Sequence, residues 1–255
     1  MLLGGRVLHA QRSHGHRSGI EPVLLAASVA ARPGESVLEA GTGGGAALLC
    51  LAARIAGVRG LGVELDPELV ALAQDNVARN GFGGIEIVQG DIATFSSIAL
   101  FDHAMANPPW YEPRATASPD SARARARQAS EGLLAVWASA LGKRLRHRGT
   151  LTFIIHAGTL AECLAAFSAA GCGSHAVMPL WPRAGRQAKL VLVQAVRGGK
   201  GPSRLLQGLV LHGEGQTYTA WADRVLREGA ALDWEAEGVM DTRLASETDG
   251  SLFNV

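Results

Sequence analysis

Long apolar runs, secretion signals and paired cysteines are all scarce or missing in this sequence. No stretch of eighteen apolar residues occurs, and about that length is needed for a membrane-spanning helix. The N-terminus also lacks the charged and apolar regions of a secretory signal peptide. We therefore expect a soluble protein that acts in the cytoplasm without a membrane partner.

Cysteine is rare, since only Cys50, Cys163 and Cys172 occur in 255 residues. Their number is odd and their spacing is wide, and no Cys-x-x-Cys pair occurs. Each lies in apolar surroundings, which is typical of buried thiols in a reducing compartment. The histidines near the N-terminus lack carboxylate or thiol partners at metal-ligand spacing. We therefore expect no bound metal.

Charge is balanced overall but segregated along the chain. The 24 basic and 23 acidic residues leave a net charge of +1, so the whole-molecule balance indicates no partner. Between residues 112 and 148 only Glu112, Asp120 and Glu131 oppose a basic cluster. The cluster consists of Arg114, Arg123, Arg125, Arg127, Lys143, Arg144, Arg146 and Arg148. It fits a phosphate-binding surface, although a solvated charged loop gives the same pattern.

Strand candidates alternate with helix candidates over most of the chain. The strand candidates are residues 36–40, 61–65, 85–88, 101–106, 151–156, 177–180 and 190–196. The helix candidates are residues 46–56, 67–79, 131–147 and 160–170. This alternation predicts an α/β fold with a doubly wound, mostly parallel sheet of seven strands.

Composition divides the chain into three parts. Residues 1–31 form an N-terminal segment that we expect to border the substrate and the cofactor, and residues 32–197 form the α/β domain. Residues 198–255 form a C-terminal extension that begins with a Gly-rich linker, and its polar last part predicts poor order. Residues 110–128 contain prolines, serines and arginines and little apolar content, which predicts a mobile loop.

A glycine-rich segment joins the first strand candidate to the first helix candidate. Its glycines are Gly41, Gly43, Gly44 and Gly45. Glycine allows a sharp turn and a close approach to a ligand, and the helix N-terminus adds unpaired N–H groups. A glycine run alone also suits a nicotinamide dinucleotide, or a tight turn without a ligand.

Carboxylates at three successive strand ends discriminate between these ligands. Glu64 can accept both hydroxyls of a ribose, Asp91 can accept an adenine amino group, and Glu39 can accept an ammonium. Nicotinamide cofactors carry no ammonium, whereas S-adenosylmethionine carries all three groups. Each carboxylate alone could be a helix cap or a surface group. Together they favour S-adenosylmethionine, whose product is S-adenosylhomocysteine.

The four residues Asn107-Pro108-Pro109-Trp110 directly follow the strand candidate 101–106. The asparagine side chain offers an acceptor oxygen and an NH2 donor. The prolines stiffen the turn and supply carbonyls without N–H groups, and the tryptophan adds a flat ring. This pattern predicts a clamp for a planar group that carries an NH2. The alternative is a strand-ending turn beside a packed aromatic.

From about Arg32 to Val196 the chain resembles the class I S-adenosylmethionine-dependent methyltransferases, which have a Rossmann-like fold. The cofactor-binding positions that the resemblance implies are Glu39, Gly41, Gly43, Gly45, Glu64, Asp91, Ile92, Arg17 and Asn107. It assigns the methionine part to Glu39 and the glycines, the ribose to Glu64, and the adenine to Asp91 with Ile92 beside the ring. Many members have Asp at the position of Glu39, which is a mild departure.

The Asn-Pro-Pro-Trp clamp resembles the (N/D)PP(aromatic) motif of enzymes that methylate adenine N6, cytosine N4, guanine N2 or a glutamine amide. The resemblance implies that the Asn107 side-chain oxygen and the Pro108 carbonyl accept the protons of the amino group, which makes its nitrogen more nucleophilic. Trp110 would stack on the ring. The implied catalytic residues are Asn107, Pro108, Pro109 and Trp110. Tyr or Phe is commoner in the last position.

The N-terminal segments 3–7, 15–19 and 23–27 resemble the start of bacterial tRNA adenine-N6 methyltransferases, which modify the adenosine beside the anticodon of a valine tRNA. Segments 180–185 and 218–223 extend the likeness to about Arg227, while Ile20-Glu21-Pro22 departs from the group's Thr/Ser-Asp-Ala-like sequence. The resemblance implies a tRNA partner. The expected RNA contacts are Trp110, Arg114, Arg123, Arg125 and Arg127.

Two other functions remain open at this point. A protein glutamine-N5 methyltransferase of the release-factor type carries a similar clamp, but it usually has a separate N-terminal helical domain, for which the glycine segment at Gly41 leaves no room. A non-catalytic nucleotide- or RNA-binding module is the other alternative. The intact glycine segment and clamp count against it. We expect a monomer.

Overall fold

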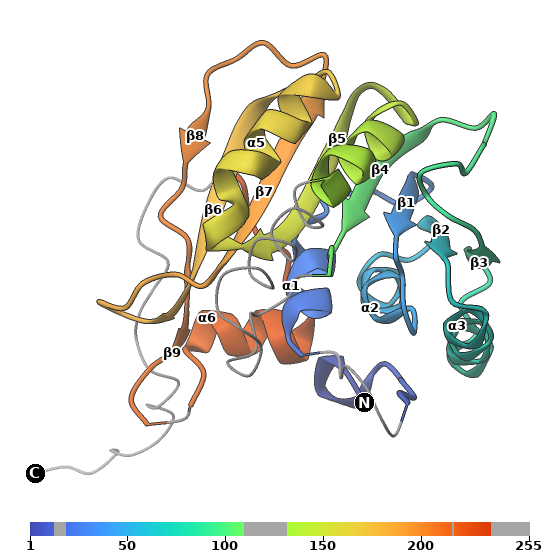
Figure 1. The fold of residues 1–255 in the computed structure, drawn as a ribbon. Coiled ribbons are helices and arrows are strands. Elements are labelled where there is room, and N and C mark those ends of the chain that lie inside the picture. The colour runs from blue at the N-terminus through green and yellow to red at the C-terminus, as the bar shows by residue number, and fades with distance from the viewer. Residues whose placement is uncertain (13–18, 110–131, 216, 236–255) are drawn as a thin grey trace, which may run out of the picture.

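The computed structural model describes residues 1–12, 19–109, 132–215 and 217–235 (Figure 1). The strands in this part of the chain are β1 (Ser36–Ala40), β2 (Arg59–Glu64), β3 (Ile85–Gln89), β4 (Phe101–Ala106), β5 (Leu145–His156), β6 (Cys172–Arg183), β7 (Leu190–Arg197), β8 (Arg204–Leu205) and β9 (Leu209–His212). The α-helices are α1 (Glu21–Ser28), α2 (Ala46–Arg54), α3 (Pro67–Asn80), α5 (Leu160–Ala169), α6 (Ala220–Asp223) and a helix at residues 132–142. Shorter helical segments are η1 (Leu3–Gly5), η2 (Ala157–Thr159) and η3 (Arg224–Glu228).

The described strands form one sheet in the order β3-β2-β1-β4-β5-β7-β6-β8, and β9 also pairs with β6. Pairing is parallel from β3 to β5, whereas β7 is antiparallel to both β5 and β6. The predicted doubly wound, mostly parallel sheet is thereby confirmed in β1 to β7. The short strands β8 and β9 enlarge it beyond the seven predicted strands. Because β1 to β5 are parallel, all of them end at one edge of the sheet, here called the carboxyl edge.

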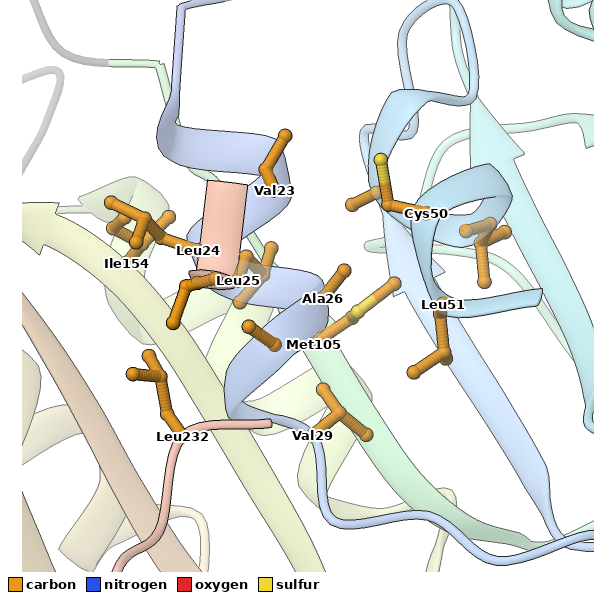
Figure 2. Close-up of a cluster of buried hydrophobic side chains, with 14 of the residues drawn as sticks. Val23, Leu24, Leu25, Ala26, Val29, Cys50, Leu51, Met105, Ile154 and Leu232 are labelled. Carbon is orange, nitrogen blue, oxygen red and sulfur yellow. The ribbon is translucent and has the colours of Figure 1, made fainter. Parts of the chain in front are cut away.

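Two apolar layers cover the sheet. On one face α1, α2, α6 and η3 pack on buried side chains such as Met105 and Ile154, as Figure 2 shows for α1. On the other face the helix at 132–142 and α5 pack on side chains such as Leu151 and Phe153. Among the described helices, none is long and apolar enough to cross a membrane.

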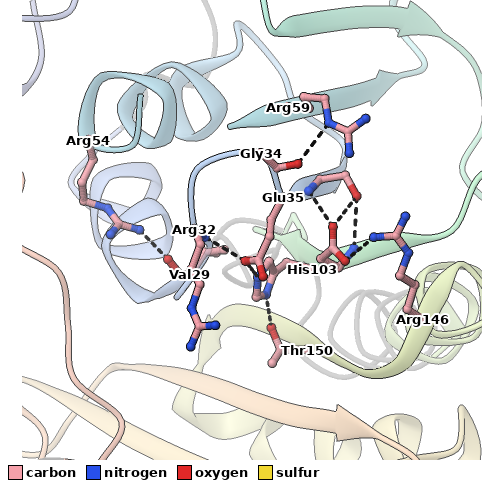
Figure 3. Close-up of polar contacts among 11 residues, drawn as sticks. Val29, Arg32, Gly34, Glu35, Arg54, Arg59, His103, Arg146 and Thr150 are labelled. Atoms are coloured by element: carbon pink, nitrogen blue, oxygen red, sulfur yellow. Dashed lines mark hydrogen bonds and ion pairs between the residues drawn. The ribbon is translucent and has the colours of Figure 1, made fainter. Parts of the chain in front are cut away.

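The opposite edge, here called the amino edge, is held by polar contacts between strand starts (Figure 3). The Asp102 carboxylate accepts hydrogen bonds from the backbone N–H and hydroxyl of Ser36, both at 2.8 Å, and pairs with Arg146. His103 contacts the Thr150 hydroxyl at 2.7 Å and the Glu35 carboxylate at 3.0 Å. These contacts fix β1, β4 and β5 side by side, which sets the level at which their other ends emerge.

The largest differences from the predicted elements lie in three parts of the structure. The strand predicted over 177–180 extends over Cys172–Arg183 as β6. The predicted helix over 131–147 ends at residue 142, and β5 begins at Leu145 instead of residue 151. The helix ends at residue 142 because the residues that follow join the sheet. Leu145 pairs with Phe101 and Thr150 with His103 of β4, and the Phe101 N–H donates to the Arg144 carbonyl at 2.8 Å. Helix α1 was not predicted, since every residue from Pro22 to Ser28 is buried and no amphipathic period marks it.

The last described residues return to the start of the chain. The backbone N–H of Leu232 donates to the Ala27 carbonyl at 2.8 Å, and the Trp234 indole N–H donates to the Ser28 carbonyl at 2.7 Å. Trp234 is only 5% exposed. Part of the C-terminal extension therefore packs against the end of α1. The poor order predicted for its last part concerns residues 236–255, which lie outside the described residues.

We expect Trp234→Ala to lower the free energy of unfolding by about 3–5 kcal/mol, because it empties a buried site and leaves the Ser28 carbonyl unpaired. Urea denaturation measures this change. Leu205→Ala is the control, since Leu205 is 76% exposed and the change should stay within about 0.5 kcal/mol. Equal unfolding midpoints for the two variants would show that the contact between Trp234 and α1 does not stabilise the protein.

Candidate cofactor and substrate site

The glycine segment forms a tight loop between β1 and α2 at the carboxyl edge. Gly41, Gly43 and Gly45 have φ angles of 62°, 56° and 85°, a region that other residues rarely adopt. The Gly41 N–H donates to the Val63 carbonyl at 2.8 Å, which holds the loop against β2. A Cβ atom built on Gly43 would meet nothing within 4 Å. The loop therefore presents backbone to open space, as a ligand cradle requires.

Glu64, at the end of β2, ties this loop to the start of α3. One carboxylate oxygen accepts from the Gly43 N–H at 2.8 Å. The other accepts from the N–H groups of Leu65 at 2.9 Å and Asp66 at 3.0 Å. A carboxylate offers about four acceptor positions, so after these three hydrogen bonds about one remains for a further donor, such as one ribose hydroxyl. Glu64 thus holds the loop against the start of α3, and it is also a predicted ligand contact.

Glu39 is a buried carboxyl group beneath the loop. It is 3% exposed, and the Thr42 hydroxyl donates to it at 2.5 Å. The pKa of Glu39 is raised to about 8, mainly by burial. The hydrogen bond from Thr42 opposes this rise, and the negative charge of Glu64 contributes to it. A carboxyl group with this pKa is mostly protonated at neutral pH, and a nearby cation would favour the loss of that proton. The position suits the ammonium of an amino-acid ligand.

Asp91 and Ile92 follow β3 at the same edge. Asp91 is exposed, and its carboxylate accepts from the Ala93 N–H at 2.9 Å. Ile92 is 5% exposed and packs with Ala40 and Val63, at the ends of β1 and β2. The structure thus places both residues beside the strand ends that carry Glu39 and Glu64.

Asn107 leaves β4 directly beside the glycine loop. The register pairs Ala40 with Ala106, so Gly41 and Asn107 emerge at the same level from adjacent strands, which lie about 4.8 Å apart. Asn107 is half-buried, Pro108 is buried and Pro109 is exposed. The other predicted site residues, Arg17, Trp110, Arg114, Arg123, Arg125 and Arg127, lie outside the described residues.

Two Asn side chains of α3, which the sequence analysis did not single out, attach the N-terminal segment to this site. The fully buried Asn76 accepts from the Ala10 N–H at 2.9 Å and donates to the carbonyls of Ala10 and Gly44, both at 3.0 Å. Asn80, one turn later, pairs with the N–H and carbonyl of Leu8 at 2.9 and 2.7 Å. Their spacing of four residues places both on one helix face.

Two aromatic rings also border the loop. A Cβ atom on Gly41 would lie 2.5 Å from the Trp137 ring, so the helix at 132–142 lies against the loop at this point. Spacing in the sequence predicted Trp137 to be a core residue, and it is half-buried. His9 lies beside Gly44, with its ring nitrogen 3.1 Å from a built Cβ, and burial lowers the pKa of His9.

Comparison with known proteins agrees with this geometry. The family model described as "Methyltransferase domain" matches residues 37–124. A tRNA1(Val) (adenine(37)-N6)-methyltransferase of Bacteroides thetaiotaomicron is 30% identical over 54% of this chain and 58% of its own length. A protein of the same description from Actinobacillus succinogenes is 28% identical over 82% of this chain and 88% of its own.

Among solved structures, a predicted O-methyltransferase from Agrobacterium tumefaciens matches with a TM-score of 0.69 at 23% identity, and covers 83% of this chain and 98% of that one. At this identity the likeness shows the fold alone. The sequence matches, with which this fold agrees, make the chain similar to the class I S-adenosylmethionine-dependent methyltransferases, and S-adenosylmethionine is the cofactor that this likeness supports. Within that class the chain resembles the bacterial tRNA1(Val) adenine-N6 methyltransferases.

We expect Asn76→Ala to weaken S-adenosylmethionine binding about tenfold, because the Gly44 carbonyl loses its buried partner and the loop loses its tether. Calorimetry measures the affinity. Asn80→Ala is the matched control, because Asn80 binds the same N-terminal segment but does not touch the glycine loop. Equal affinities in the two variants would show that Asn76 does not position the loop.

Cofactor binding should release a proton from Glu39. With a pKa of about 8, this carboxyl group is about nine-tenths protonated at pH 7, and a bound ammonium favours its charged form. The cofactor dissociation constant should therefore fall as pH rises toward 8. Calorimetry at pH 7 in buffers of different ionisation enthalpy counts the protons.

Glu39→Gln is the control for this measurement, because it removes the carboxyl proton while the titration of the ligand's own amine stays the same. We expect the variant to release nearly one proton fewer than the wild type. Identical proton counts would show that Glu39 is not linked to the ligand.

Proposed function

We propose that this protein transfers a methyl group from S-adenosylmethionine to the exocyclic N6 amino group of an adenine in tRNA. The observation that carries the proposal is the position of Asn107, which follows β4 at the level where the cofactor loop follows β1. An acceptor for an amino group thereby lies next to the proposed site of the methyl donor. Neither a metal nor a nucleophilic side chain is part of the proposal.

The reacting nitrogen needs acceptors because its lone pair is delocalised into the ring. In the proposed complex the Asn107 side-chain oxygen and the Pro108 carbonyl accept hydrogen bonds from its two N–H groups, which makes the lone pair more available. Bound S-adenosylmethionine supplies an electrophilic methyl group on a sulfonium. As the N–C bond forms and the C–S bond breaks, the nitrogen becomes positively charged, and the same two oxygens stabilise that charge until one proton leaves to solvent.

The cofactor contacts are proposed residue by residue. Glu39 would face the ammonium, as its buried carboxyl group requires a cation or a proton. The open backbone at Gly43 would face the methionine part. Glu64 would share its carboxylate between the loop and the ribose, and the exposed Asp91 would reach the adenine amino group.

The choice of tRNA rests on the relatives. Bacterial proteins that match this chain at 28 to 36% identity carry the description tRNA1(Val) (adenine(37)-N6)-methyltransferase. The chain spans 58% of the Bacteroides protein and 33% of one from Glaesserella parasuis, so activity and partner remain proposals here. A target adenine must leave its stack to reach Asn107, which is easiest in a loop. The RNA contacts at Trp110, Arg114, Arg123, Arg125 and Arg127 also remain predictions.

Incubation with radiolabelled S-adenosylmethionine and total tRNA, followed by nucleoside analysis, tests the proposal. We expect label in N6-methyladenosine. Asn107→Leu should lose at least about a hundredfold in turnover because it removes one acceptor, while its cofactor affinity stays close to that of the wild type.

Asn107→Asp is the matched control, because a carboxylate of the same size still accepts the amino protons. We expect it to retain more turnover than Asn107→Leu. Normal turnover in both variants would remove Asn107 from the reaction. Label found only in protein would favour a glutamine methyltransferase, and binding of tRNA without any transfer would favour the non-catalytic module.

A further inference from the structure

The hairpin of β6 and β7 stands beyond the level at which β4 ends. The register places Ala106 level with Phe153, Val193 and Val177 on the next three strands, yet β6 continues to Arg183. At about 3.3 Å per residue, this extension measures roughly 20 Å. The loop between β6 and β7 accordingly projects at the left of Figure 1. The hairpin therefore stands beside the carboxyl edge, where Asn107 and the cofactor loop lie.

A cleft of about 490 Å³ opens between the tip of this hairpin and the segment 207–210. It is lined by Trp181, Ala184, Gly185, Arg186, Gln187, Gln207, Gly208 and Val210. The Trp181 indole is fixed, because its N–H donates to the Gln207 carbonyl at 2.9 Å. Gly208, with a φ of 85°, permits this close approach, since a Cβ there would collide with the Pro179 carbonyl.

The chemistry of the lining suits a planar, polar ring. A held indole offers an apolar surface for stacking, which every nucleobase can use. Gln187 and Gln207 are among the lining residues and are exposed, and a side-chain amide can donate to and accept from the edge of a base. The lining therefore combines an apolar ring with residues that can form hydrogen bonds.

The charge around the cleft favours an anion. From residue 163 to residue 213 the sequence contains no Asp or Glu. Arg186 and Lys189, at the hairpin tip, are exposed, and neither forms an ion pair with a residue in the described part of the chain. Arg183 differs from these two exposed cations because its guanidinium group donates to the Gly213 carbonyl at 2.6 Å. The two exposed cations can therefore meet phosphates.

We propose that this cleft binds a second nucleotide of the RNA substrate, apart from the adenine that is methylated. Its base would lie against Trp181, and the adjoining phosphates would meet Arg186 and Lys189. This inference rests on the proposed function. Strand spacing and rise place Trp181 roughly 17 Å from Asn107, too far for one base to occupy both places. The cleft thus positions the RNA while the target base enters the clamp.

Two lysines with the same exposure give a matched test of the phosphate contact. Lys189 lies at the hairpin tip and Lys200 lies beyond β7, toward the amino edge, and both are exposed. We expect Lys189→Glu to raise the KM for tRNA and the directly measured tRNA dissociation constant by roughly tenfold, with kcat nearly unchanged. The salt slope of binding should fall by about one. Lys200→Glu should leave all of these values unchanged.

Substitutions at Trp181 test the base contact. We expect Trp181→Leu to raise the KM for tRNA between about fivefold and a hundredfold, which is the range of one lost base stack, and Trp181→Phe to raise it less. Cofactor affinity and the unfolding midpoint show whether each variant is intact. If Trp181→Leu weakens cofactor binding as much as tRNA binding, its effect is structural and the base contact is refuted.

The other outcomes separate this inference from the proposed function. If the wild type methylates tRNA and Lys189→Glu behaves like Lys200→Glu, the cleft is not a substrate subsite, although the function stands. If the wild type does not methylate tRNA, the proposed function fails, and the tRNA dissociation constants of the two lysine variants still decide whether the cleft binds RNA. Tighter binding of a protein substrate than of tRNA, lost in Lys189→Glu, would overturn the nucleotide assignment.

Discussion

The amide of Asn76 is the constraint on which the geometry of the site depends. This one buried side chain joins α3, the cofactor loop and the N-terminal segment through three hydrogen bonds. Glu64 holds the same loop from the other side. Protein groups therefore hold the loop from both sides, so that less binding energy is needed to order it. A buried amide cannot easily give up such partners, because leaving any of them unpaired is costly.

Much of this arrangement could be predicted from the sequence, because it depends on local rules. Parallel strands and the glycine turn leave periodic signals, and Asn107 follows a strand whose bounds were predicted correctly. Asn76 and Trp137 were not predicted as site residues, because their roles depend on which residues meet across the fold. An Asn inside a helix gives no signal that its side chain is buried, and a Trp at core spacing gives none that it lies against a glycine loop.

Part of the basic cluster, which was defined by closeness in the sequence, lies away from the site. Its members Lys143, Arg144, Arg146 and Arg148 lie at the start of β5, and Arg146 pairs there with Asp102 at the amino edge. Arg144 lies 5.4 Å over the Phe95 ring. Arg144 and Arg146 therefore serve the packing of the sheet on the side away from Asn107, and Lys143 and Arg148 lie exposed near them. The cations of the β6–β7 hairpin, distant in sequence, share the edge of the site instead.

The contact between the two ends of the described chain also has a consequence for synthesis. Helix α1 is made early, but its cover at Leu232 and Trp234 is made some two hundred residues later. Until those residues leave the ribosome, the part of α1 that they cover lacks its final partner, and the carbonyls of Ala27 and Ser28 lack these hydrogen bonds. Since chains grow at about 5–20 residues per second, this state lasts for at least about ten seconds. Apolar surface that is exposed for such an interval makes a nascent chain prone to aggregation.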